Sequence, residues 1–330
     1  MSGPDPLNPP TAPRRLSRRG LLAAVPLLAS PAIAAPPVVL RVGTSNDAGG
    51  FSVYGEAFAD AIKWANPSIT VRLERTQGSA ENAALLQEGR LDLGLVSGEV
   101  VHSLFNPAAG PPNDLTIVSV ALSTPGMFVV RNESRYRTLS DLRDRPVVWT
   151  VRGSSAALQA RFTLEPLGLD MEKDFEPVFT DRMTDGVALL LDGRASAMWG
   201  TGKRWAGFIA VADDPLGARF VTPGPEESAR IVERYRFLHR TVVPASSYRR
   251  QFEAIETVGS WSYLLAGPQV SPEAGYVLAA ALHRVEGISS TLAGGVLADA
   301  TIGKTLAALP RAGRLQPGVE KYFREVSAIN

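Results

Sequence analysis

Residues 76–96, with the sequence TQGSAENAALLQEGRLDLGLV, constrain the fold of this chain most strongly. They contain a polar turn, a helical pattern that ends at Gly89, and a buried apolar run that is typical of a strand. The preceding segment, SITVRLERTQ, alternates as a strand does. Together they form a strand-loop-helix-strand unit, and repeats of this unit predict a parallel sheet covered by helices.

The same order occurs at the start of the chain and again in its middle. PVVLRVGTS reads as a strand, NDAGG as a loop, and 51–65 as a helix that stops before Asn66-Pro67. Later, RPVVWTVRGSSAALQARFTLEPLG gives strand, loop and helix, and DGVALLLDGRASAMWGT gives helix and strand. The segments LLQEGRLDLGLV and LLLDGRASAMWG also share a helix that ends in Gly-Arg before a strand, which favours two related α/β lobes.

The chain is predicted to cross between the lobes twice. STPGMFVV, around Pro125, reads as the first crossing, and TVVPASSY with ETVGSWSYLLAG reads as the return. We therefore expect residues 35–124 and 245–330 to form the first lobe and 125–244 the second, with hinges near Pro125 and Pro244. Each lobe should hold a mixed, mainly parallel sheet. After the return, Ser271 and Pro272 predict a helix start, and the chain should end in an amphipathic helix.

Residues 1–34 have the features of a secretory signal peptide: basic residues, a short apolar run and a small-residue ending at Ala34. The run of 14 residues contains two prolines and is too short to span a bilayer. Arg18-Arg19 resembles a twin-arginine signal, which we favour over the general secretory route. Cleavage would leave 296 residues and change the formal charge from +1 to −2, since four arginines and one aspartate leave with the peptide.

Composition excludes several functions. The chain has no cysteine, which rules out disulfides, thiolate zinc sites and cysteine nucleophiles. Its charge is nearly balanced, so no nucleic-acid partner is expected. The three histidines, His102, His239 and His283, lack metal-ligand spacing, and no hydrolase or nucleotide-binding motif is present. We therefore expect an exported soluble protein without cofactor or metal that is not an enzyme.

Three loops that join a strand to a helix, NDAGG, QGSAEN and RGSSAA, suggest a ligand site. Such loops meet at one edge of a parallel sheet, where helix amides without internal partners attract anions. Serine, asparagine and glycine are also ordinary cap and turn residues, so each loop alone reads more simply as a cap. The three together predict a site formed by Thr44, Ser45, Asn46, Gly49, Gly50, Gly78, Ser79, Asn82, Ser154 and Ser155.

A carboxylate ligand also calls for a cation and for a wall of larger side chains. Arg152 and Lys203 are the candidate cations, with a solvated surface role as the alternative for Arg152. For Tyr54, a place in the site and a place in the core are equally favoured. We include it in the predicted site. Core packing is favoured for Trp199. Asp92 is expected to pack structurally at the start of a strand.

Several motifs together resemble the TAXI family of extracytoplasmic solute receptors, the partners of TRAP transporters. They are VGTSNDAGGFSVYGEAFADAI, TQGSAENAALLQEGRLDLGLVSGEVVHSLFN, TLSDLRDRPVVWTVRGSSAALQARFTLEPLGLD, VPASSY and LQPGVEKYFRE. The resemblance implies a two-lobe periplasmic binding protein of type II, whose cleft closes on a small organic anion such as glutamate, 2-oxoglutarate or a dicarboxylate. It also implies membrane contact only through the TRAP-type permease subunits.

The sequence departs from the family pattern in three loops. The first loop, with Asn46 and Asp47, has less glycine than is normal in the family. Residues 153–155 read Gly-Ser-Ser in place of Gly-Ser-Gly, and GTGKRWAGF, with Lys203, Arg204 and Trp205, stands where a Gly-x-Pro turn is usual. These changes bear on ligand identity more than on fold. Two other functions stay open: a ligand sensor of the same fold that signals to a membrane kinase, and a cofactor-free enzyme. Porphobilinogen deaminase shares the architecture but attaches its cofactor through a cysteine.

Overall fold

The computed structural model describes residues 38–46, 50–106, 113–182, 185–203, 205–289, 291, 295–326 and 328–329. The predicted signal peptide lies outside the described residues, as do Asp47, Gly49 and Arg204. Within the described ranges, no helix combines the length and the apolar character needed to cross a membrane.

Three parallel strands and their helices form the first lobe, called lobe 1 here. Strand β1 (Val38–Gly43) lies between β2 (Ile69–Glu74) and β3 (Leu93–Ser97), and all three are parallel. They are connected by α1 (Gly50–Ala65) and α2 (Ser79–Gln87), and α3 (Gly98–Leu104) follows β3. The predicted strand-loop-helix-strand units are confirmed. Gly89 adopts the left-handed φ of 70° just beyond α2, which only glycine takes at little cost.

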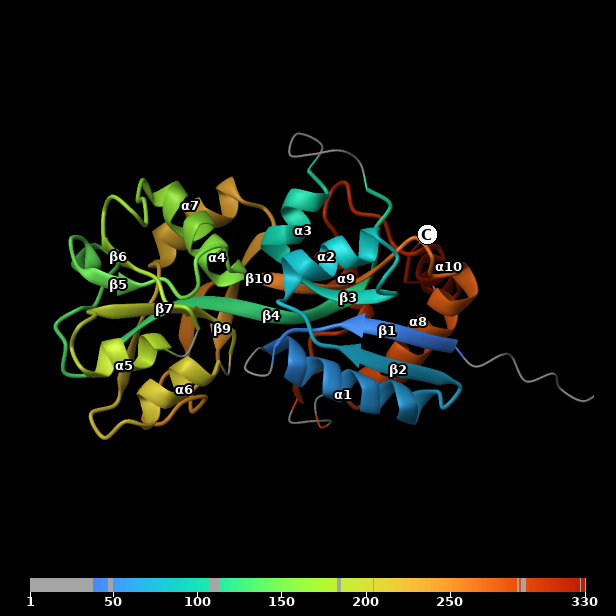
Figure 1. Cartoon of the computed structure of the whole chain (residues 1–330), viewed down its shortest axis with the longest axis horizontal. Coiled ribbons are helices and arrows are strands. Elements are labelled where there is room, and N and C mark those ends of the chain that lie inside the picture. The colour runs from blue at the N-terminus through green and yellow to red at the C-terminus, as the bar shows by residue number, and fades with distance from the viewer. Residues whose placement is uncertain are drawn as a thin grey trace, which may run out of the picture. The chain divides into compact units, whose positions relative to one another are not determined.

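Two long strands connect this lobe with the second. Strand β4 (Thr116–Arg131) pairs with β10 (Ile255–Ala266) along its first part and with β7 (Ala197–Thr201) along its last part, antiparallel in both cases. Strand β10 also pairs with β3 and with β9 (Leu238–Val243). The predicted boundaries of the lobes stay a prediction, while the strands that cross between them run through the middle of Figure 1.

Lobe 2, the part of the chain around β5 to β8, repeats this arrangement. Its parallel strands are β5 (Pro146–Val148), β6 (Glu176–Val178) and β7, and β8 (Ala218–Val221) pairs antiparallel with the end of β4. Its helical elements are η1 (Ser140–Leu142), α4 (Ser155–Leu164), η2 (Glu165–Leu167), α5 (Asp185–Leu191), α6 (Ala206–Asp213) and α7 (Pro225–Arg234).

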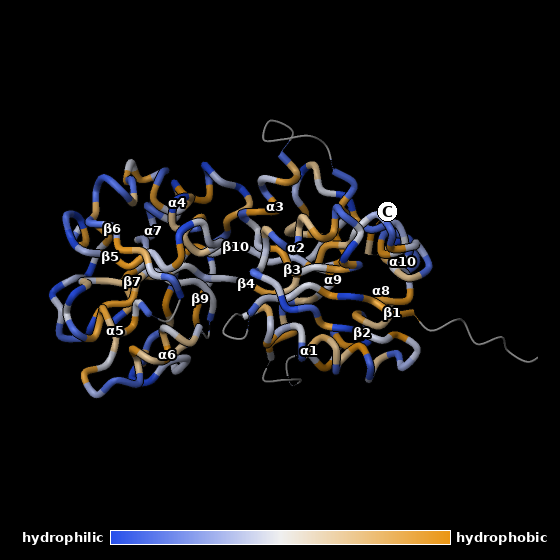
Figure 2. The backbone as a smooth tube through the Cα atoms, in the orientation of Figure 1, coloured by the Kyte–Doolittle hydropathy of each residue, from blue (hydrophilic) through white to orange (hydrophobic). Residues whose placement is uncertain are grey.

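Alternation along the strands gives each lobe a core on both faces of its sheet. In β4, Phe128 faces the core under α4, while Met127 and Val129 face the core under α5 and α6. Trp199 is fully buried beside Phe128, so its predicted place in the core is confirmed. Figure 2 shows the apolar residues gathered in the strands and on the adjoining helices, with hydrophilic connections outside.

The C-terminal part of the chain returns to lobe 1 as α8 (Pro272–Glu286), α9 (Ile302–Ala307) and α10 (Pro317–Glu325). The predicted cap is confirmed, since the Ser271 hydroxyl accepts a hydrogen bond from the Ala274 amide. Asp92 is also structural as expected: both its carboxylate oxygens accept hydrogen bonds from the Arg41 guanidinium, which ties β3 to β1.

Candidate functional site

The carboxyl ends of the central strands of both lobes lead to the region where β4 crosses between them. Two neighbouring residues of β4, Ser123 and Thr124, mark this point. The Ser123 amide donates to Asp299 of lobe 1, and the Thr124 carbonyl accepts from Gln159 of α4 in lobe 2. The backbone of this pair is therefore contacted by one polar side chain from each lobe, and we call the pair the floor of the two groups of polar side chains described next.

The first group contains the beginnings of helices α2 and α4, one from each lobe. The Ser155 hydroxyl donates to the Ser79 hydroxyl over 3.2 Å, and the Ser79 hydroxyl also accepts from the Ser97 amide at the end of β3. Ser79 and Ser155 are the first residues of their helices. The amides of a first turn have no partner within the helix, and the helix dipole adds positive potential there. Two such ends meeting across the lobes favour a negatively charged ligand.

Asn82 determines how the loops of lobe 1 are arranged. Its side chain is fully buried, and its amide nitrogen donates to the carbonyls of Thr44 and Leu95 at 2.8 Å each. Its carbonyl oxygen accepts from the Thr76 hydroxyl, also at 2.8 Å. One side chain therefore links the ends of all three parallel strands. A Cβ on Gly43 would lie 2.4 Å from the Asn82 oxygen, so this packing also requires glycine at that position.

The corresponding loop of lobe 2 has unusual backbone geometry. Thr150 is fully buried and has a φ of 68°, in the left-handed region that β-branched residues rarely adopt. Gly153 shares that region with a φ of 77°. The Ser154 hydroxyl caps α4 by accepting from the Ala157 amide and lies 3.3 Å from the Thr150 hydroxyl. Strain of this kind is concentrated at binding sites, where neighbouring structure holds it in place.

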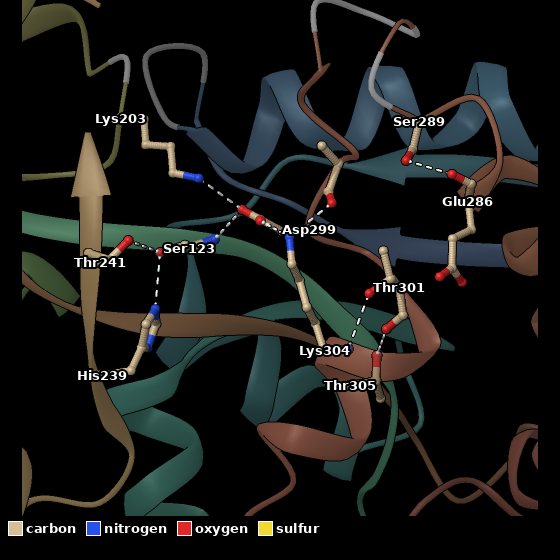
Figure 3. A network of polar contacts seen from close by, with 11 residues as sticks. Ser123, Lys203, His239, Thr241, Glu286, Ser289, Asp299, Thr301, Lys304 and Thr305 are labelled. Carbon is tan, nitrogen blue, oxygen red and sulfur yellow. Dashed lines mark hydrogen bonds and ion pairs between the residues drawn. The ribbon is translucent and has the colours of Figure 1, made fainter. Parts of the chain in front are cut away.

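The second group is charged and connects the lobes by an ion pair (Figure 3). Lys203, which follows β7, places its amine 3.3 Å from one carboxylate oxygen of Asp299, and the Lys304 amine lies 2.7 Å from the other. Burial raises the pKa of Asp299, but the hydrogen bond from Lys304 and the charge of Lys203 outweigh it, so the pKa is lowered. Asp299 is therefore ionised at neutral pH, and two lysines against one aspartate leave a charge of +1.

Two buried polar atoms that have no hydrogen-bond partner within the described ranges lie beside this charged group. His239 stacks on Trp261 with ring centroids 4.3 Å apart and an interplanar angle of 12°, its Nε2 lies 3.3 Å from the Ser123 hydroxyl, and its Nδ1 has no partner among the described residues. The Tyr54 hydroxyl also lacks one, and its pKa is raised by burial and by the negative charge of Asp299. Tyr54 itself is fully buried and packs on Phe58.

His239 gives the stability of the protein a specific pH dependence. Burial lowers the pKa of this imidazole to about 4, partly opposed by Asp299 and assisted by Lys203. Between about pH 4 and pH 6.5 the unfolded chain therefore binds a proton at this histidine that the folded chain does not. We expect the folded state to lose on the order of 2 kcal/mol relative to the unfolded state as pH falls through that window, after allowance for partial solvation.

The measurement is urea unfolding at half-unit steps from pH 4 to pH 7.5 for the wild type and for His239→Asn. Carboxylates titrate in the same range and affect both proteins, so the difference between the two curves isolates the imidazole. A difference that stays constant with pH would contradict a buried neutral histidine.

Next to the floor lies a buried carboxyl group in α3. Glu99 is 2% exposed, and its Oε1 has no hydrogen-bond partner among the described residues. The hydroxyl of Ser262, the β10 residue opposite Ser97, also has no hydrogen-bond partner among the described residues. Burial raises the pKa of Glu99, opposed by the nearby Ser260 hydroxyl. A raised pKa reduces the negative charge that this residue contributes beside the site.

The remaining predicted residues lie at the junctions where a strand leads into a helix. Gly78 is the N-cap of α2 with a φ of 102°, and Gly50 is the first residue of α1. Ser45 and Asn46 follow β1, and the Asn46 carbonyl accepts hydrogen bonds from the hydroxyls of Ser45 and Ser52. Arg152 is turned to the surface of lobe 2, where it pairs with Glu172 at 2.6 Å and covers the Phe179 ring at 3.8 Å. Their contact with a ligand stays a prediction.

Sequence reasoning did not find several residues of this region. Asp299 and Lys304 lie in an irregular stretch and a short helix, and Ser123 and Gln159 carry no motif. A lone aspartate or glutamine gives no signal until the chain is folded. In the part of the chain that the structure describes, no group of three or more histidine, aspartate or glutamate side chains could hold a metal ion.

Two α/β lobes joined by the long strands β4 and β10 form a two-lobe periplasmic binding protein fold. A solute-binding protein of the TctC type from Polaromonas superposes with a TM-score of 0.53 at 16% identity, covering 81% of this chain and 88% of that one. The periplasmic aliphatic sulphonate binding protein SsuA of Escherichia coli gives a TM-score of 0.49 at 18% identity, covering 88% and 83%. A family model described as the NMT1-like family matches residues 42–326, so this chain belongs to the NMT1-like family.

Proposed function

We propose that this protein is an extracytoplasmic solute receptor of the TAXI type that binds a small organic anion between its lobes and delivers it to a TRAP-type membrane transporter. The family and the fold support the general role of solute binding. The TAXI motifs of the sequence support the finer assignment, and the leader at residues 1–34 supports export to the periplasm. The proposed ligand is held and released without chemical change.

One observation carries the choice of an anion: positive potential converges on the crossing point from both lobes. The first turns of α2 and α4 meet through Ser79 and Ser155, and Lys203 with Lys304 exceeds Asp299 in charge. A ligand carboxylate between them would accept hydrogen bonds from first-turn amides and from Lys203. The hydroxyls of Thr44, Ser45 and Ser154 would bind its neutral oxygens, while Asn82 would hold the loops in place.

Thermal unfolding of the purified protein tests this proposal. The panel contains glutamate, 2-oxoglutarate, succinate and other dicarboxylates, aliphatic sulfonates, and sugars as neutral controls. A ligand at a hundredfold excess over its Kd stabilises the native state by about 2.7 kcal/mol, which a melting curve detects readily. We expect a shift with one class of organic acid and none with sugars. Stabilisation by sugars or amines alone would contradict an anion receptor.

The membrane partner is tested separately. The receptor, loaded with the acid from the panel, is added to proteoliposomes that contain the candidate TRAP-type permease, and uptake of the labelled acid is followed. Uptake that depends on the receptor supports delivery. Tight binding of the acid without any receptor-dependent uptake would contradict the transport role and leave sensing by a membrane kinase as the better explanation.

A further inference from the structure

A groove of about 930 Å³ opens where strands β4 and β10 separate. The two strands pair as far as Gly259 opposite Pro125, and beyond that point β8 takes the place of β10 beside β4. Residues of β8, β9 and β10 line the groove, which we call the β8/β10 groove. It touches the site described above only through Thr241, whose hydroxyl lies 3.4 Å from that of Ser123.

Both walls of the groove are strand edges without a neighbour among the described residues. Strand β8 pairs only with β4, and the first four residues of β10 pair only with β9. A strand with one neighbour leaves every second amide and carbonyl without a ladder partner on its other side. Such an edge accepts an added strand from another chain unless charge or a bulge prevents it.

Arginines without acidic partners gather at the β8 side. The guanidinium groups of Arg137 and Arg219 both donate to the carbonyl of Ser134, at 2.7 and 3.1 Å. Arg250 donates to the Pro215 carbonyl at 2.9 Å. None of these three has a carboxylate within ion-pair distance in the described part of the chain, and the Ser134 hydroxyl is buried without a partner there.

The charge of this cluster is concentrated because its members are close. Burial, followed by the positive charge of Arg137, lowers the pKa of Arg219. Like charges held together without a counter-ion favour a ligand that brings negative charge. Arg240 lies on β9 and donates to the Pro225 carbonyl, so it is the third arginine, after Arg219 and Arg250, among the residues that line the groove.

The β10 side has the opposite character. Glu253 and Glu256 line it, and neither forms an ion pair with a described residue. Phe252 projects there with 83% of its surface exposed. A segment with acidic side chains would therefore be attracted to the β8 edge and repelled by the β10 edge, and an apolar residue beside it could cover Phe252.

We propose that the β8/β10 groove binds an extended acidic segment of a partner protein, which adds to the edge of β8 as a strand and directs its carboxylates to Arg219 and Arg250. The open edge supplies backbone hydrogen bonds, and the arginines select for acidic side chains. Docking at this place does not use the solute site, so a partner can bind whether or not solute is present.

The test uses a fluorescein-labelled peptide of eight residues that alternates glutamate and valine, with fluorescence anisotropy as the readout. The same peptide with lysine in place of glutamate tests the charge, and a version with alternate backbone amides methylated tests strand addition. We expect binding of the acidic peptide alone. Equal binding of the lysine or the methylated peptide, or no binding of the acidic one, overturns the proposal.

Matched variants locate the binding. Arg219→Glu and Arg250→Glu should each weaken binding of the acidic peptide about tenfold or more. Arg311 is an exposed arginine far along the chain, and Arg311→Glu should change the affinity for the peptide less than twofold. Circular dichroism checks folding, and Arg250→Gln, expected to weaken binding several-fold, replaces any variant that fails to fold.

If vesicles of phosphatidylglycerol bind with the same arginine dependence and the peptide does not, the surface recognises a membrane and the proposal is wrong.

Discussion

Replacement of Asn82 by aspartate is expected to lower the free energy of unfolding by about 4 kcal/mol. The side-chain nitrogen of Asn82 donates to two carbonyls, those of Thr44 and Leu95, and is fully buried. Aspartate has nearly the same shape but places a carboxylate oxygen against those two carbonyls. Both hydrogen bonds to these carbonyls are lost, and a negative charge is buried without a neighbouring cation. Urea unfolding at pH 7 measures the difference.

Asn66→Asp is the matched control for this prediction. In the native protein, Asn66 uses its side-chain oxygen to accept hydrogen bonds from the amide and hydroxyl of Ser68, and aspartate keeps that role. We expect a change of no more than about 0.5 kcal/mol. If Asn82→Asp were as stable as this control, the hydrogen bonds of Asn82 would not be needed to hold the three strand ends of lobe 1 together.

The second large effect concerns Lys203, the cation that reaches across the lobes. Lys203→Met should weaken binding of the acid identified in the thermal panel by about 30-fold, since a charge-assisted hydrogen bond contributes about 2 kcal/mol. Asp299→Asn should act in the opposite direction. It removes the carboxylate that competes for Lys203 at 3.3 Å, and we expect affinity to rise about fivefold although the protein becomes less stable. Isothermal titration measures both affinities.

Lys173→Met provides the control for charge in general. This lysine is highly exposed and pairs only with Asp170 on the surface of lobe 2, so affinity should stay within a factor of two. The opposite pattern is also informative. If Asp299→Asn abolished binding while Lys203→Met had little effect, Asp299 would hold a positively charged group of the ligand, and an anion would be the wrong class.

Each of the two polar groups contains a contact between the lobes. Ser79 and Lys203 each belong to one lobe, and each finds its partner, Ser155 or Asp299, in the other. A solute placed between these pairs would be contacted from both sides, so its binding energy would favour the closed arrangement over an open one. The hinge predicted near Pro125 lies beside Ser123 and Thr124, where both groups meet the floor.

The sequence alone determined the α/β units, because each depends on local signals. The helices that begin at Gly50, Ser79 and Ser155 follow short polar or glycine-containing turns, and Ser154 caps the last of them; the strands before them are short apolar runs. Local signals also identified the loops that converge, since the carboxyl ends of parallel strands share one edge. They could not separate residues that face a ligand from residues that hold a loop, as Asn82 shows.

Tertiary structure decided the charge and the partners within the site. Asp299 and Lys203 are 96 residues apart, and Ser123 and His239 are 116 apart, so no spacing along the chain relates them. Arg152, a candidate cation for the site with a surface role as its alternative, pairs with Glu172, and its contact with a ligand stays a prediction. Local sequence specifies backbone conformation through caps and periodicity. Which charges meet depends on how β4 and β10 bring distant segments together, and that is a property of the folded chain alone.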